Sequence, residues 1–207
     1  MKDRSSATHS AGRKTRPARL PDHVRPGARV LFVGINPGLR SAALGHHFAG
    51  ASNRFWRLLH ESGLLPMPMT YAEDGRLPEW GYGITNLVAR PTRGIDALGS
   101  AECETGRLRL LATIARVRPR IVALLGITIY RSIFAARART REVRLGLQRE
   151  ALGGARVFLL PNPSGRNAHV PYSEMLGAFR SLKEYLEMYA PTGADGREAS
   201  READGDA

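Results

Sequence analysis

Val30-Leu31-Phe32-Val33 and the five residues that follow, Gly34-Ile35-Asn36-Pro37-Gly38, decide the fold class. A short, unbroken apolar run is typical of a strand that is buried on both faces, as the strands of a parallel sheet are. The glycines and the proline after it favour a tight loop whose backbone can approach a ligand closely. In an open parallel sheet, ligands bind beyond the carboxyl ends of the strands. We therefore expect a parallel sheet with a functional loop at residues 34–38.

Short apolar runs alternate with helical patterns along the rest of the chain. Further strands are predicted at residues 84–88, 121–125 and 157–160, and helices at residues 53–62, 101–117, 127–136 and 172–189. The inner face of the first helix would be Phe55, Trp56, Leu58 and Leu59, and that of the second Leu108, Leu111, Ala112 and Ala115. This order predicts an α/β protein, a three-layer α/β/α domain with a central, mainly parallel four-stranded sheet.

The composition limits the kind of protein. With 207 residues, of which 43% are hydrophobic, the chain can form one domain with a sizeable core. No stretch reaches the roughly 20 consecutive apolar residues of a membrane span, and the N-terminus lacks the apolar run of a signal peptide. We therefore expect no membrane contact and a cytoplasmic, nucleoid-associated location. Cys103 is the only cysteine, which excludes an intramolecular disulfide and a cysteine-ligated zinc or iron–sulfur site.

The charge is strongly positive and unevenly distributed. Lys and Arg number 31 against 19 Asp and Glu, and the net charge of +12 indicates a polyanionic partner. Residues 1–29 carry a net charge of +6 and are interpreted as a disordered basic arm. Residues 191–207 carry −3 and are interpreted as a flexible acidic tail. The domain itself, residues 30–190, is basic without the arm, with a net charge of +9.

A second loop of unusual composition follows the predicted strand at residues 157–160. It reads Pro161-Asn162-Pro163-Ser164-Gly165-Arg166-Asn167-Ala168-His169, and it would lie at the same sheet edge as residues 34–38. The first loop lacks the glycine patterns of nucleoside-triphosphate and dinucleotide sites. Residues 23–60 and 151–173 contain no Asp or Glu. A binding site between two loops that lack carboxylates favours a phosphate backbone as the partner.

Five motifs carry a resemblance to a known family. They are Gly34-Ile35-Asn36-Pro37-Gly38-Leu39, Gly45-His46-His47-Phe48, Asn53-Arg54-Phe55-Trp56, Thr85-Asn86-Leu87-Val88 and Asn162-Pro163-Ser164-Gly165. Over residues 30–186, in residues and spacing, the chain resembles the mismatch-specific uracil/thymine-DNA glycosylases, the Mug and thymine-DNA glycosylase branch of the uracil-DNA glycosylase superfamily. The resemblance implies the fold of those enzymes and a monofunctional hydrolase acting on mispaired uracil in G·U pairs, with thymine and modified pyrimidines as further candidates. Such an enzyme flips the nucleotide out of double-stranded DNA and hydrolyses its N-glycosidic bond, which initiates base excision repair.

The resemblance also implies a base pocket. Asn36 matches the catalytic position, where an amide can position a water molecule but cannot deprotonate it. Phe48 matches the ring that stacks on the base. The expected pocket consists of Gly34, Ile35, Pro37, Gly38, Ser41 and Phe48, with backbone N–H groups of Ile35, Gly38 and Phe48 as candidate donors to the pyrimidine carbonyls. From the residues alone, Asn36 could instead cap its own turn, and Phe48 could be a core aromatic.

The second loop corresponds to the intercalation loop, which fills the hole left by the flipped base. Its expected DNA-binding residues are Asn162, Pro163, Ser164, Gly165, Arg166, Asn167 and His169. Arg166 stands where Mug has an apolar residue; a guanidinium can stack and donate to the orphaned guanine, which leaves the strictness of opposite-guanine specificity open. His169 could donate to a phosphate or cap the last helix. His46 and His47 are expected at the pocket mouth, and Asn53 and Arg54 as supports of the first loop.

Two rival functions stay open at this stage. One is a relaxed uracil-DNA glycosylase that ignores the opposite base, and the other is a non-catalytic module that binds mispaired or abasic DNA. No cofactor is expected, and no metal, because adjacent histidines point in different directions and no third ligand has suitable spacing. No lysine lies in either loop, so no Schiff-base lyase chemistry is expected. We expect a monomer, and the sequence identifies no downstream repair enzyme.

Overall fold

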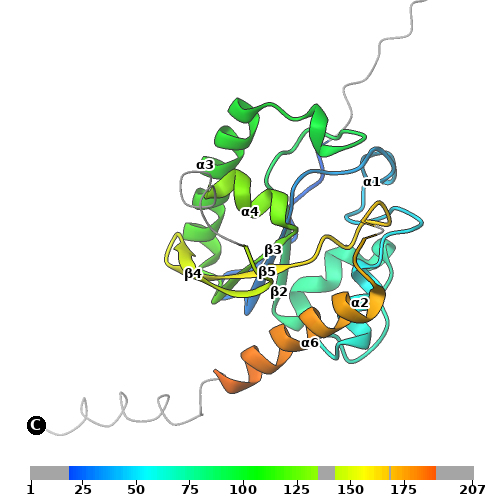
Figure 1. Cartoon of the computed structure of the whole chain (residues 1–207), viewed down its shortest axis with the longest axis vertical. Coiled ribbons are helices and arrows are strands. Elements are labelled where there is room, and N and C mark those ends of the chain that lie inside the picture. The colour runs from blue at the N-terminus through cyan, green and yellow to red at the C-terminus, as the bar shows by residue number, and fades with distance from the viewer. Residues whose placement is uncertain (1–18, 135–142, 168, 190–207) are drawn as a thin grey trace, which may run out of the picture.

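A five-stranded sheet runs through the centre of the molecule (Figure 1). The computed structural model describes residues 19–134, 143–167 and 169–189. The strands are β1 (Val30–Gly34), β2 (Tyr82–Asn86), β3 (Ile121–Leu125), β4 (Gly146–Leu152) and β5 (Ala155–Leu160), in the spatial order β2-β1-β3-β5-β4. β4 is antiparallel to β5, and the other pairs are parallel. The carboxyl ends of β1, β2, β3 and β5 therefore share one edge of the sheet.

Helices cover both faces of this sheet and complete three layers (Figure 1). On one face, α2 (Phe55–Glu61) and α6 (Tyr172–Met188) pack with the 3-10 helix Tyr71–Trp80 in one core cluster. On the other, α3 (Ser100–Val117) and α4 (Ile127–Ile133) form a second cluster. The short α1 (Leu39–Leu44) and the 3-10 helix Ile95–Ala97 complete the elements. The predicted α/β/α class with a mainly parallel sheet is confirmed, as is the buried face Phe55, Trp56, Leu58 and Leu59 of α2.

The sheet has one strand more than predicted. β4 and β5 form a hairpin whose turn is Gly153-Gly154, with positive φ angles of 57° and 84°. β4 reads GLQREAL and alternates between partly buried and exposed residues, as an edge strand does, so it contains no apolar run. A Gly-Gly pair between two extended stretches is a hairpin signal, and this signal would have revealed the strand.

α3 is rotated relative to the predicted inner face, of which Leu111 alone packs against the core, partly buried. Leu108 is 57% exposed, and Ala112 and Ala115 are exposed as well. The buried residues of the helix are Gly106, Leu110, Thr113, Ile114 and Val117. Gly106 explains this orientation, because a Cβ there would lie 2.4 Å from the carbonyl oxygen of Leu87. Only glycine lets the helix approach the chain after β2 so closely.

Residues 19–29 belong to the fold rather than to a disordered arm. Leu20 and Ala28 are almost fully buried, and His23 pairs with Ile84 in an antiparallel bridge. The boundary expected at residue 29 is therefore too late. Residues 1–18 of the expected arm and the expected acidic tail, 191–207, lie outside the described residues. Within the described ranges, no helix combines the length and the apolar character that crossing a bilayer needs.

The close contact at Gly106 predicts opposite effects for two glycine substitutions. Gly106→Ala should destabilise the fold by about 1–3 kcal/mol, because the new methyl group must displace backbone atoms. Gly177→Ala is the matched control: it lies in α6, no atom lies within 4 Å of the place that its methyl group would take, and the helix should gain about 1 kcal/mol. Urea denaturation of both variants measures the change, and equal effects of both would contradict the close approach of α3.

Candidate active site

A cavity of about 760 Å³ opens at the carboxyl edge of the sheet, between the loops that follow β1 and β5. The predicted base-pocket residues Gly34, Ile35, Asn36, Pro37, Gly38, Ser41 and Phe48 all line it, and so do Asn162, Ser164, Gly165, Arg166 and Asn167 of the second loop. The fold therefore brings the two sequence-distant loops to one cavity. Pro163 and His169 are not among its lining residues. Pro163 is buried, whereas His169 is exposed.

The side-chain amide of Asn36 is held in one orientation. Its Nδ2 donates to Thr92 Oγ1 at 2.8 Å and lies within hydrogen-bond distance of the Pro37 and Arg90 carbonyl oxygens. Thr92 uses its own proton in a 2.6 Å bond to Gly94 O, so its hydroxyl can only accept from Asn36. The amide nitrogen thus faces three acceptors. The amide oxygen accepts no hydrogen bond from the described part of the chain and is available to a molecule in the cavity.

Phe48 forms one wall of the cavity, and its backbone is held in the left-handed region, with φ 52°. Its ring packs on the buried ring of Phe55, with centroids 4.3 Å apart. The tip of the ring nearly touches Gly34, where a Cβ would lie 3.2 Å from Phe48 Cζ and 2.7 Å from Asn86 Oδ1. Non-glycine residues with positive φ are uncommon and occur at sites that the surrounding structure constrains. At position 34, only glycine fits, because a side chain there would collide with Phe48 and Asn86.

His47, which was expected at the pocket mouth, lines the cavity together with Asn86, to which the sequence assigned no pocket role. Asn86 Nδ2 lies 3.2 Å from His47 Nδ1, and His47 Nε2 lies 2.9 Å from the carbonyl oxygen of Pro21. The pair is satisfied when the neutral ring carries its proton on Nε2 and accepts at Nδ1. Burial lowers the pKa of His47 below its ordinary value of 6.5, against smaller raising effects of the Pro21 carbonyl and of Asp74. The sequence signal for Asn86 is the Thr85-Asn86-Leu87-Val88 motif, because the strand predicted at residues 84–88 places this residue inside a strand and not at its end.

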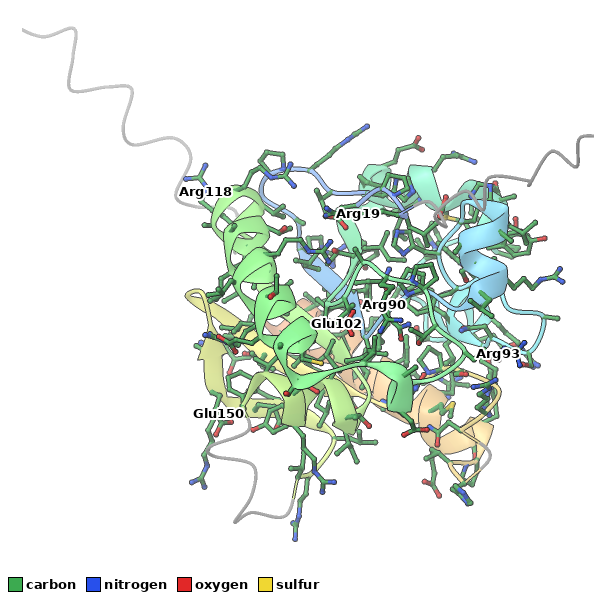
Figure 2. All side chains as sticks on the ribbon, turned by 90° about the horizontal axis from the view of Figure 1, so that it is seen from above. Arg19, Arg90, Arg93, Glu102, Arg118 and Glu150 are labelled. Carbon is green, nitrogen blue, oxygen red and sulfur yellow. The ribbon has the colours of Figure 1, made fainter. Side chains whose placement is uncertain are left out.

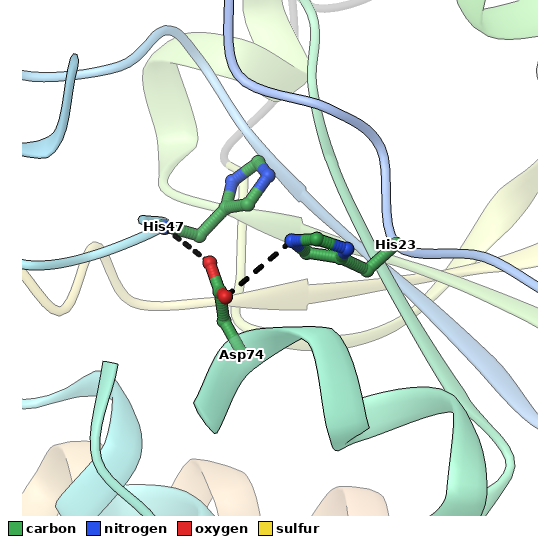
Figure 3. A group of neighbouring side chains, drawn as sticks. All are labelled: His23, His47 and Asp74. Atoms are coloured by element: carbon green, nitrogen blue, oxygen red, sulfur yellow. Dashed lines mark hydrogen bonds and ion pairs between the residues drawn. The ribbon is translucent and has the colours of Figure 1, made fainter. Parts of the chain in front are cut away.

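A buried carboxylate, Asp74, anchors the loop that carries Phe48 (Figure 3). Its oxygens accept from the backbone N–H of His47 at 2.7 Å and contact His46 Nδ1 at 2.9 Å and His23 Nε2 at 3.4 Å. His23, His47 and Asp74 also form a group with the spacing of possible metal ligands. Both ring nitrogens of His47 already have partners, however, so a metal would have to displace one of them. The arrangement fits a brace of the residue 45–50 loop better than a metal centre. His46 is not among the residues that line the cavity.

Arg54 supports the second loop, not the first as expected from the sequence. Its backbone N–H donates to Pro163 O at 2.9 Å, and its guanidinium donates to Ser164 O at 3.2 Å and Asn167 O at 3.0 Å. Asn162 Oδ1 accepts from the N–H of Ser164 at 3.0 Å, which forms an Asx turn. Asn53 Oδ1 accepts from the N–H of Phe55 at 3.0 Å at the start of α2. The second loop is thus held by Arg54, immediately before α2.

The rim of the cavity is predominantly basic. Arg166 is exposed, and its guanidinium donates to the carbonyl oxygen of Arg93 on the loop across the cavity. Arg93, labelled in Figure 2, and Arg40 also line the cavity. Among the lining residues described, Asp96 is the one carboxylate, and it is exposed. Ser41 is buried, with its Oγ accepting from the N–H of Ala49 at 3.0 Å, so its hydroxyl stabilises the wall. A polyanion would meet mainly positive charge at this mouth.

Comparison with known proteins finds a family model and a solved structure that match the chain. The family model of the uracil DNA glycosylase superfamily matches residues 21–185. Among solved structures, the chain resembles the solution NMR structure of a provisionally assigned uracil DNA glycosylase from Methanosarcina acetivorans, with a TM-score of 0.56 and 17% sequence identity. The similarity covers 81% of this chain and 98% of that one. At 17% identity, this structural match supports a shared fold alone.

The environment of His47 predicts a ring that is mostly neutral at pH 6.5 in the folded protein, because its pKa is lowered from that value. Because the pKa is lowered in the folded state, the unfolded chain takes up the proton first as the pH falls. His47 therefore contributes stability above pH 6.5 that is lost as the pH falls towards its folded pKa. Imidazole ¹⁵N NMR between pH 8 and 5 should show Nε2–H and an unprotonated Nδ1 at pH 6.5. The urea-unfolded chain is the reference, and a charged ring at that pH in the folded protein would contradict the assignment.

Proposed function

The chain belongs to the uracil DNA glycosylase superfamily, and on this premise we propose that it excises uracil from mispairs with guanine in double-stranded DNA. The single observation that carries the proposal is the fixed amide of Asn36 facing a cavity whose other side is the Asn162–Arg166 loop. Thymine and alkylated or etheno-modified pyrimidines are further candidate bases. The finer assignment to the mismatch-specific branch rests on the motifs that both loops contain.

The cavity offers the groups that a flipped pyrimidine needs. The ring of Phe48 is positioned to stack on the base. The N–H groups of Ile35, Gly38 and Phe48 donate to no backbone partner in the described ranges, so they are available to the pyrimidine carbonyls. Such donors stabilise the negative charge that develops on a departing base. Flipping itself costs a few kcal/mol and least for a mispaired base, which favours uracil opposite guanine over paired uracil.

We assign to Asn36 the positioning of the attacking water. The C–N glycosidic bond breaks with both electrons leaving on the base, and the water bound at Asn36 Oδ1 then attacks the oxocarbenium-like sugar. The water's proton leaves to solvent or to the departing base anion, and the products are free base and an abasic site. An amide provides no general base, a contribution typically worth about 100–10,000-fold, so excision should be slow.

Arg166 is our candidate for the residue that occupies the gap in the duplex. Its loop is held from behind by Arg54, so the exposed guanidinium stands on a fixed base. A guanidinium is planar, stacks on bases and presents donors to the guanine that has lost its partner. These properties support recognition of the opposite base, and they distinguish this loop from an apolar wedge.

An oligonucleotide assay tests the proposal. Duplexes with uracil opposite guanine or adenine, and single-stranded uracil DNA, are incubated with the protein and then cleaved with alkali at abasic sites. We expect excision that is fastest for uracil opposite guanine. Equal rates on both duplexes would indicate a relaxed uracil glycosylase, and binding without release of base from any substrate would indicate a non-catalytic module.

Substitutions around Asn36 test its role. Asn36→Ala should lower the single-turnover excision rate by about 100-fold, since the water loses its position. Thr92→Val, which removes the acceptor of the amide proton, should give a rate between those of wild type and Asn36→Ala, whereas Thr92→Ser should retain most of the activity. Asp96→Asn separates the alternatives: a loss as large as that of Asn36→Ala would place a general base at Asp96 and contradict the proposed mechanism.

Substitution of Arg166 tests its contact with the duplex. Arg166→Ala should slow excision from the guanine-opposed duplex by about tenfold and hardly change excision from single strands, where no gap needs filling. Arg131→Ala removes an exposed arginine that does not line the cavity and controls for the loss of charge alone. Equal losses for Arg166→Ala on both substrates would show that this arginine does not act in the duplex.

A further inference from the structure

Arginines gather at the edge of the sheet opposite the cavity. Arg29 precedes β1, Arg120 precedes β3, and Arg156 is the second residue of β5. Backbone hydrogen bonds join these positions: Arg156 N–H donates to Arg120 O at 3.3 Å, and Ile121 N–H donates to Arg29 O at 3.3 Å. Since adjacent strands lie about 4.8 Å apart, the three arginines form a row about 10 Å long across the amino ends of three neighbouring strands.

Three more arginines extend this row. Arg116 and Arg118 lie at the carboxyl end of α3, and Arg25 lies in the turn whose Gly27 N–H donates to Val117 O at 2.7 Å. In Figure 2, Arg118 lies on the opposite side of the molecule from Arg93, which lines the cavity. We call the six exposed residues the rear arginine face: Arg25, Arg29, Arg116, Arg118, Arg120 and Arg156.

These arginines differ from many others on the surface in having no carboxylate partner. Arg57, Arg76, Arg90 and Arg107 form ion pairs with glutamates. In the described residues, no member of the rear arginine face is within ion-pair distance of a carboxylate. The helix dipole accounts for a cation at the end of α3, but not for a row of arginines along strand ends. An unneutralised group of like charges indicates a partner that supplies the opposite charge.

The guanidinium of Arg156 is already held in place. Arg156 lies over the rings of Tyr185 and Tyr189, 5.9 Å and 5.1 Å from their centroids, and donates to the Tyr185 hydroxyl. The two rings lie 4.7 Å apart and, with Arg120, line a small cavity of about 250 Å³. A side chain that is fixed before binding loses less freedom when a ligand arrives.

We propose that the rear arginine face binds the phosphate backbone of a second DNA segment. The strands between this face and the cavity are five to six residues long, about 17–20 Å, so a straight duplex at the cavity does not reach the opposite edge. One protein molecule would therefore hold two duplexes at once. Contacts between arginines and phosphates depend on charge and not on base sequence. They therefore allow the protein to pass from one DNA segment to another while it searches for its target site. The inference rests on the family's DNA binding and not on the proposed base specificity.

Bridging of two undamaged duplexes tests this face directly, because the readout requires no excision. Donor-labelled and acceptor-labelled 20-base-pair duplexes are mixed with the full-length protein at low salt, and energy transfer between them is measured. We expect transfer with the wild type. The triple variant Arg29→Gln, Arg118→Gln, Arg120→Gln should bridge at least tenfold less well. The matched triple Arg131→Gln, Arg149→Gln, Arg180→Gln, with the same loss of charge, should bridge within about twofold of wild type.

Further arms make each outcome decisive. The charge-retaining triple Arg29→Lys, Arg118→Lys, Arg120→Lys should restore most bridging, and thermal melting checks that all variants fold. Equal loss in both glutamine triples would overturn the proposal in favour of net charge alone. A bridged particle containing two protein molecules by analytical ultracentrifugation would overturn it in favour of self-association. A last variant replaces the carboxylates of residues 191–207 by their amides, at Asp195, Glu198, Glu202, Asp204 and Asp206. Bridging by this variant alone would overturn the proposal for the intact chain, because the chain's own carboxylates would then be the ligand of the face.

Discussion

The candidate site depends on the way the chain after β2 continues alongside the loop after β1. Past the end of the parallel ladder, the N–H groups of Leu87 and Val88 donate to the carbonyl oxygens of Gly34 and Ile35, each at 2.8 Å. Thr92 N–H then donates to Pro37 O at 3.2 Å. This continued pairing places the Thr92 hydroxyl beside the amide of Asn36. The orientation of one amide group, and with it the direction of its free oxygen, follows from backbone pairing between segments more than 50 residues apart.

The wall of the cavity shows how buried polar groups can fix a binding site. Asp74 is only 2% exposed, and a carboxylate so deeply buried is costly unless donors surround it. It receives the backbone N–H of His47 and the ring of His46, and thereby fixes the loop that places Phe48 against Phe55. His47 in turn connects to Asn86 at the end of β2. The network joins the 3-10 helix Tyr71–Trp80, the Phe48 loop and the sheet edge into one rigid wall. Rigidity matters here because a pocket that must hold a flipped base gains from groups that are in place beforehand.

Positive charge occurs at both ends of the strands, but in different settings. At the cavity it surrounds a concave site with polar groups inside, where charge can guide a polyanion and the enclosed groups can read a base. At the opposite edge it lies on an open surface with a small aromatic pocket. The parallel arrangement of β1, β3 and β5 accounts for both charged regions. The loops that follow these strands lie together at one edge of the sheet, and the residues that precede the strands lie together at the opposite edge.

The sequence by itself was sufficient for the class of fold and for the loops that line the cavity. Unbroken apolar runs such as Val30–Val33 identify buried parallel strands, and the rule that ligands bind at their carboxyl ends brings residues 34–38 and 161–169 together. The hairpin signal Gly153-Gly154 indicates β4 as well, although the alternating pattern of this edge strand resembles a loop. The sequence was not sufficient for the inward face of α3, which a contact of Gly106 with the backbone of Leu87 selects. It also missed the roles of Thr92, Asn86 and Asp74, and it assigned Arg54 to the wrong loop. Each of these depends on a contact between segments far apart in the chain. Local composition determines which elements form, whereas the partners of a single side chain depend on how those elements pack, and only the tertiary structure decides that.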